Sequence, residues 1–158
     1  MKIERLNRLT KEIKDYIYSE KVELDSYKIK KSAAKNLNDL NKDSSQWSDY
    51  VFGEQAEEKE HFWLKFDFEV PEKMDGENLV VIFEDKLPEA VVYVDGKIKQ
   101  GIDQNHKVVE ITKKAEAGKN HTVYLHGYNG TWQANKRGGF AGFKDGKIRV
   151  KAKLSILN

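Results

Sequence analysis

Cysteine is absent from this sequence of 158 residues. The chain therefore has no disulfide framework and no thiolate chemistry. Long apolar runs are missing too: none approaches the roughly 20 residues of a membrane-spanning helix. The charged N-terminus also lacks the unbroken apolar core of a secretory signal. We expect a cytoplasmic protein without a membrane partner.

An excess of charge of one sign is also lacking. Lysine and arginine number 28 against 26 acidic residues, which leaves a net charge of +2. Nucleic-acid binding needs positive charge concentrated on one face, so no nucleic-acid partner is expected. The aromatic share of 11% argues against disorder, because aromatic side chains supply buried apolar area.

An amphipathic helix is predicted over residues 3–19. Apolar side chains recur there at spacings of three and four, at Ile3, Leu6, Leu9, Ile13 and Ile17. After Lys21 the helical period does not return. We divide the chain into an N-terminal helix, residues 1–22, and a β-sandwich, residues 23–158, in a single domain that we expect to be a fragment of a longer polypeptide.

Strand patterns fill most of the remaining sequence. Alternation of apolar and polar residues is clearest over residues 61–70, and Pro71 ends that strand. Asp95-Gly96 predicts a tight hairpin turn. Further strands are expected at residues 79–84, 89–94, 97–99, 121–126 and 147–157. Short strands separated by turns indicate a sandwich or barrel.

Two other segments have weaker patterns. Residues 32–55 are polar and irregular, which predicts a long surface connection. The last strand carries lysines on one side, which favours the solvated side of an edge strand. A groove for a polyanion is the alternative interpretation of these lysines.

Catalytic and metal-binding patterns are scarce. His121 and His126 lie five residues apart on one expected strand, so they point to opposite faces and cannot share a metal without a bulge. No paired zinc or calcium spacing, serine-nucleophile motif or phosphate-binding glycine loop is present. We predict no catalytic residue, no metal site and no cofactor in this chain. The chain alone is expected to be inactive.

Aromatic residues outside the core pattern are the candidates for sugar contacts. An exposed ring can hold the apolar face of a sugar, and Tyr128, Trp132 and Trp63 are placed to do so. For Trp63 the favoured alternative is burial under the second sheet or the N-terminal helix. For Trp132 both interpretations stay open, because turn residues surround it.

Residues 90–97, Ala-Val-Val-Tyr-Val-Asp-Gly-Lys, resemble the strand and turn of sugar-binding-like jelly rolls that precede glycosidase catalytic domains. Residues 100–106, Gln-Gly-Ile-Asp-Gln-Asn-His, are more specific: they closely resemble the N-terminal domain of bacterial-type glycoside hydrolase family 38 α-mannosidases. The resemblance covers nearly the whole chain. It also includes the leading helix, residues 47–53, 63–71 and 109–112, and Asn129-Gly130.

This resemblance implies a fold, a partner and a role. The fold would be mainly β: a jelly-roll, galactose-binding-like β-sandwich with one N-terminal amphipathic α-helix. The family's catalytic domain carries zinc and an aspartate nucleophile in a motif that does not occur in this chain. The resemblance therefore implies a non-catalytic accessory domain whose partner is the catalytic domain of the same polypeptide, with zinc held by that absent domain.

The loop residues Asp103, Asn105 and His106 match the family's motif, although Gln104 stands where arginine is common. Asp103 and Asn105 can accept backbone N–H groups two residues on and so hold a turn. The alternative is that the loop contacts the catalytic domain. Together with Trp132 and Tyr128, these three residues are the candidates for a carbohydrate or domain interface. A carbohydrate-binding module that takes mannose-containing glycans is the second functional hypothesis.

Overall fold

The computed structural model describes residues 2–84, 87–130 and 146–158. The alternation predicted for residues 61–70 forms β5 (Glu60–Glu69). Its side chains Phe62, Leu64, Phe66 and Phe68 are buried in the core. β5 pairs on one side with β10 (Asn120–Asn129) and on the other with β2 (Tyr27–Lys31). This pairing places β5 near the middle of a sheet.

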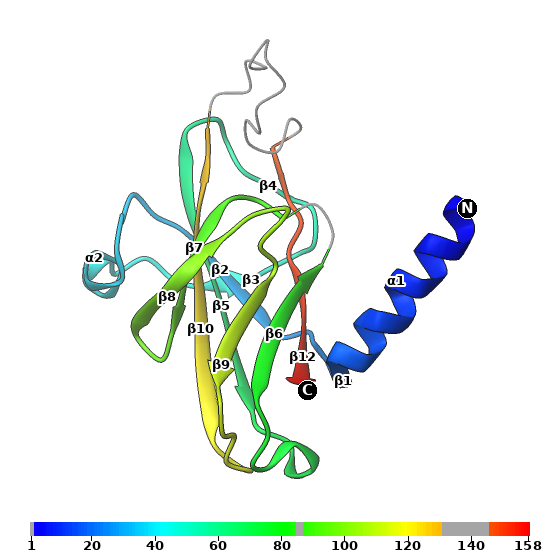
Figure 1. The fold of residues 1–158 in the computed structure, drawn as a ribbon. Coiled ribbons are helices and arrows are strands. Elements are labelled where there is room, and N and C mark those ends of the chain that lie inside the picture. The colour runs from blue at the N-terminus through cyan, green and yellow to red at the C-terminus, as the bar shows by residue number, and fades with distance from the viewer. Residues whose placement is uncertain (1, 85–86, 131–145) are drawn as a thin grey trace.

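Two antiparallel sheets face one another across the core (Figure 1). The six-stranded sheet has the order β3-β2-β5-β10-β7-β8, and the four-stranded sheet the order β1-β12-β6-β9. The predicted β-sandwich with one N-terminal helix is therefore confirmed. The strands not yet located are β1 (Tyr18–Leu24), β3 (Ser48–Asp49), β6 (Leu79–Glu84), β7 (Ala90–Val94), β8 (Lys97–Ile102), β9 (Val108–Thr112) and β12 (Lys151–Leu157).

Smaller elements complete the described chain. A short ladder pairs β4 (Glu54–Gln55) with β11 (Lys147–Ile148). A single 3-10 turn, η1 (Glu72–Met74), follows Pro71. The hairpin at Asp95-Gly96 is confirmed between β7 and β8, and both of its residues have positive φ, 49° and 82°. A second Asp-Gly pair, Asp145-Gly146, precedes β11 in the sequence and falls partly outside the described residues.

The N-terminal helix α1 runs from Ile3 to Ile17, close to the predicted residues 3–19. It ends where β1 begins, because the chain takes an extended conformation at Tyr18. None of its residues is buried, and Figure 1 shows it projecting away from both sheets. Among the described residues, no helix is long and apolar enough to cross a membrane.

Two tyrosines tie the sheets together inside the sandwich. The Tyr27 hydroxyl accepts a hydrogen bond from the Ala152 N–H at 2.8 Å. The Tyr50 hydroxyl accepts from the Val150 N–H and donates to the Ile148 carbonyl, both at 2.8 Å. Burial raises the pKa of Tyr27 to about 12, so the hydroxyl keeps its proton. These bonds satisfy backbone groups of the C-terminal segment where it leaves regular pairing.

The prediction of an edge position for the last strand is wrong. β12 lies between β1 and β6, because the segment that follows α1 adds a strand outside it. Lys153 on this strand forms ion pairs with Glu23 on β1 at 3.2 Å and with Glu84 on β6 at 2.7 Å. The lysine charge is therefore balanced by carboxylates on both neighbouring strands, an arrangement that an edge strand does not offer.

The prediction for residues 32–55 was incomplete. The segment contains the short helix α2 (Leu37–Lys42), which begins at Asn36, whose side chain accepts the Asp39 N–H. It also contains β3 and β4. Leu40 of α2 is buried against the outer face of the six-stranded sheet. The helix is too short for its pattern to be distinguished from a loop in the sequence.

Candidate functional site

The loop between β8 and β9 contains Asp103, Asn105 and His106. Asp103 Oδ1 accepts the backbone N–H of Asn105 at 2.7 Å and that of His106 at 2.8 Å. The His106 ring nitrogen Nδ1 lies 2.9 Å from the same oxygen. The Asn105 N–H, followed by the His106 N–H and ring, lowers the pKa of Asp103. The loop is therefore a closed turn organised by the Asp103 carboxylate, as the turn interpretation expects for Asp103; the same bond predicted for Asn105 stays a prediction.

The same turn is held to its neighbours by two glutamine amides. Gln104 Nε2 donates to the Leu87 carbonyl at 2.7 Å, and Gln100 Nε2 donates to the Val108 carbonyl at 2.9 Å. His106 itself points outward, with 71% of its side chain exposed. Asn105 is exposed as well, so the imidazole, the Asn105 amide and the outer side of the carboxylate are available to a partner at this loop.

Tyr128 lies at the same end of the six-stranded sheet as this loop. The sheet register aligns Gly127 with Ala90, and Ala90 with Ile102, across three neighbouring strands. Tyr128 and Asp103, which follow Gly127 and Ile102, therefore have backbones about 10 Å apart at one end of the sheet, because two strand spacings separate them. Tyr128 is 44% exposed there. Trp132, the other aromatic candidate, lies outside the described residues.

Tyr128 ends a row of four rings on the outer face of this sheet. The buried Trp63 stacks on His126 with ring centroids 4.4 Å apart and an angle of 7°. His126 Nε2 lies 2.9 Å from His61 Nδ1, and the His61 ring lies 4.6 Å from the ring of Tyr128. Only the last ring of the row offers a largely open surface.

The two histidines meet through a nitrogen-to-nitrogen hydrogen bond. Their centroids are 5.1 Å apart, about the sum of that bond and the two ring radii, so the rings lie edge to edge. Burial, followed by the charge of His61, lowers the pKa of His126 to about 4. Burial, followed by Lys35, also lowers the pKa of His61. In a neutral pair of this kind, one ring donates its N–H to the lone pair of the other.

The histidine pair was missed in the sequence, which directed attention to His121 and His126. Their predicted placement on opposite faces of the sheet is confirmed. His121 lies on the core side, with its Nδ1 2.7 Å from Asp95 Oδ2, whereas His126 lies on the outer face. The partner of His126 depends on the β5–β10 register, which sets Trp63 opposite His126 and His61 opposite Tyr128. In the described part of the chain, no group of three or more potential metal ligands converges.

Trp63 is fully buried, as the favoured interpretation held, but the predicted cover is wrong. The indole lies in a buried cluster with Leu40 of α2, and Ala34, Leu37 and Trp47 pack against this cluster. Its Nε1–H donates to the Ala34 carbonyl at 3.0 Å. Neither the second sheet nor the N-terminal helix covers this ring, since the first lies across the core and α1 projects away (Figure 1). Trp63 is therefore removed from the aromatics available to a sugar.

A family model described as the α-mannosidase jelly roll domain matches residues 22–144. That span contains the β8–β9 loop and most of both sheets. The chain belongs to this family. The search of curated proteins found no match to this chain.

Solved structures of glycosidases contain a domain with the same fold as this chain. A β-glucuronidase from Ruminococcus gnavus superposes with a TM-score of 0.61 at 12% identity, over 88% of this chain and 29% of that chain. A β-glucuronidase from Lactobacillus rhamnosus gives a TM-score of 0.62 at 17% identity, over 86% and 28% of the two chains. The α-mannosidase jelly-roll chain thus spans less than a third of these enzymes.

Proposed function

We propose that this chain is the non-catalytic N-terminal accessory domain of a glycoside hydrolase family 38 α-mannosidase and supports the catalytic domain of the same polypeptide. The observation that carries the proposal is the match of the α-mannosidase jelly-roll family over residues 22–144. In the similar glycosidase structures, a sandwich of this fold makes up less than a third of a longer chain. The activity itself would reside in residues outside this chain.

The arrangement of polar groups supports a structural role. The carboxylate of Asp103 is engaged by its own turn, and the imidazoles of His61 and His126 bond to one another. A general base or metal ligand needs a lone pair aimed at substrate or metal, whereas Asp103 Oδ1, His61 Nδ1 and His126 Nε2 each face a neighbouring group of the same domain. The zinc expected for the family would be held by the catalytic domain. The absence of cysteine fits a reducing, cytoplasmic location, which we include in the proposal.

The reading frame after Asn158 tests this function directly. We expect a segment with a zinc-binding motif, turnover of an aryl α-mannoside by the full polypeptide, and no turnover by residues 1–158 alone. Hydrolysis by the isolated chain would replace the proposal with a stand-alone hydrolase. A following segment unrelated to glycosidases would also overturn it.

Carbohydrate binding is the second candidate function, favoured by the exposed ring of Tyr128 beside His61. Titration of the chain with mannose and manno-oligosaccharides, followed by tryptophan fluorescence, tests it. Saturable binding that Tyr128→Ala weakens at least 10-fold would support this function. A signal that stays flat up to high millimolar sugar would count against it.

A further inference from the structure

One side of α1 is an apolar surface that lies open to solvent. Its apolar residues are solvent-exposed, with relative exposures from 38% for Ile17 to 81% for Tyr16. We call this set the α1 stripe; it comprises Ile3, Leu6, Leu9, Ile13, Tyr16 and Ile17. Because the helix projects away from the sandwich (Figure 1), neither sheet covers the stripe. A contiguous apolar surface of this kind marks an interaction site.

The helix has little to stabilise it without a cover. A helix of 15 residues is marginal in water on its own. The residue before its first turn, Lys2, makes no side-chain capping hydrogen bond. Polar residues fill the remainder of its circumference, so burial of the stripe is the stabilisation that its sequence pattern provides for.

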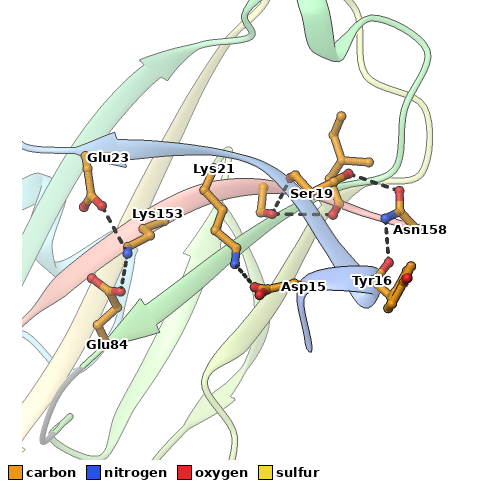
Figure 2. A network of polar contacts seen from close by, with 10 residues as sticks. Asp15, Tyr16, Ser19, Lys21, Glu23, Glu84, Lys153 and Asn158 are labelled. Carbon is orange, nitrogen blue, oxygen red and sulfur yellow. Dashed lines mark hydrogen bonds and ion pairs between the residues drawn. The ribbon is translucent and has the colours of Figure 1, made fainter. Parts of the chain in front are cut away.

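The foot of α1 is tied to the end of β12. The backbone N–H of Asn158 donates to the Ile17 carbonyl at 2.9 Å, and its side-chain amide donates to the Tyr16 carbonyl at 2.7 Å. The Ser19 hydroxyl donates to the Asn158 side chain at 3.1 Å. Figure 2 shows these contacts beside an ion pair of Asp15 with Lys21. Any polypeptide that follows Asn158 would therefore leave the sandwich beside the C-terminal end of α1.

The area of the stripe argues against a second copy of this chain as its cover. A helix of 15 residues is about 22 Å long and about 10–12 Å across, so its surface around the full circumference measures only about 800 Å². Specific complexes bury about 800 Å² on each partner. Two α1 stripes packed together use one face each and fall well short of that value. A domain of the same polypeptide needs less buried area, because covalent linkage makes its contact with the stripe intramolecular and raises its effective concentration.

We infer that the α1 stripe is a docking surface that inserts into an apolar groove of the catalytic domain encoded after Asn158. This inference rests on the proposed function, because that function supplies the catalytic domain. The tie between Asn158 and the last turn of α1 places the two partners next to one another at the start of the connection. The helix would then join the accessory and catalytic domains.

Hydrogen exchange of the α1 amides in two proteins, residues 1–158 and the full polypeptide, tests the inference. We expect exchange at least 10-fold slower in the full polypeptide, since docking protects the helix. Leu6→Ser with Ile13→Ser should remove this protection. Glu4→Ser with Lys11→Ser is the matched control on the polar side, with the same spacing and the same new residues, and it should keep the protection.

Equal exchange rates in the two proteins would overturn the docking inference while leaving the proposed function intact. A reading frame without a glycosidase domain would instead remove the proposed function, and the inference with it, before any exchange is measured. Analytical sedimentation of residues 1–158 tests whether a second copy of the chain covers the stripe instead. The contrary result is a dimer of residues 1–158 at about 10 micromolar that the Leu6→Ser, Ile13→Ser double variant no longer forms. Such a result would assign the stripe to a second copy and overturn the inference.

Discussion

Lowering the pH from 7 to 4 is expected to destabilise the sandwich through the His61–His126 pair. Burial lowers the pKa of His126 from 6.5 to about 4 in the folded chain. Between these two values the unfolded chain binds a proton at this ring that the folded chain does not bind. Protonation therefore favours unfolding, so stability is fully present above about pH 6.5 and is lost progressively as the pH falls toward 4. His61, whose pKa is also lowered by burial, acts in the same direction.

The magnitude follows from the same shift. At about 1.4 kcal/mol per pKa unit, the upper bound is about 3 kcal/mol. Solvent reaches part of the His126 ring and screens its charge, which reduces the expected loss to about 1–2 kcal/mol. Carboxylates held by hydrogen bonds act at lower pH: that of Asp43, with a pKa of about 2 because of the Ser32 hydroxyl, loses its contribution below pH 4. The pH range in which the histidines act, from about 6.5 to 4, therefore lies above the range in which this carboxylate acts.

Urea unfolding followed by circular dichroism at pH 7, 6, 5 and 4.5 measures this effect. His126→Gln should lower stability at pH 7, because it removes the ring stacked on Trp63, and should flatten the dependence on pH between 6.5 and 4.5. His106→Gln, at an exposed histidine, is the matched control and should keep the wild-type slope. A wild-type slope that persists in His126→Gln would refute this reasoning.

Three further substitutions probe the sandwich by urea unfolding. Gly127→Ala places a Cβ 2.1 Å from Phe62 Cζ, so a loss of about 1–3 kcal/mol is expected. Phe62→Leu in the same chain should recover part of it, and strictly additive effects would contradict the steric explanation. Trp63→Ala should cost about 3–5 kcal/mol because the ring is fully buried; a loss under about 1 kcal/mol would show that residues 34–40 do not cover it. Asp103→Ala should lower the stability, because two turn N–H groups lose their acceptor, whereas Asp103→Asn should keep most of it. An Asp103→Ala chain that melts like the wild type but lowers the activity of the full polypeptide would favour the interface role instead.

The strand content could be predicted because burial leaves a period-two record in the sequence. β5 and β12 alternate over most of their length, with Trp63 and Ser155 buried as exceptions, and the Asp95-Gly96 turn specifies its hairpin through positive φ at both residues. The order of strands in each sheet leaves no such record. The lysines of β12 predicted an edge, yet β1 pairs outside that strand, because pairing between residues far apart is decided by the packing of the whole core.

The candidate site divides in a similar way. The turn bonds of Asp103 are local, spanning two and three residues, so residue types and spacing were enough to predict them. The contact of His61 with His126 joins residues 65 positions apart and exists only in one register of β5 against β10. A shift of one residue would move His126 to the other face of the sheet.

By itself, the sequence determined an amphipathic helix, a series of antiparallel strands, a turn centred on Asp103 and a resemblance to α-mannosidase jelly rolls. Each depends on short-range chemistry: side-chain period, turn conformation or a contiguous motif. Only the tertiary structure decided that Trp63 is covered by α2, that two histidines form a hydrogen bond on the outer face, and that the apolar side of α1 stays exposed. The physical reason is that a residue's pattern shows whether it favours burial, whereas the surface that buries it is set by strand register and by contacts between distant segments.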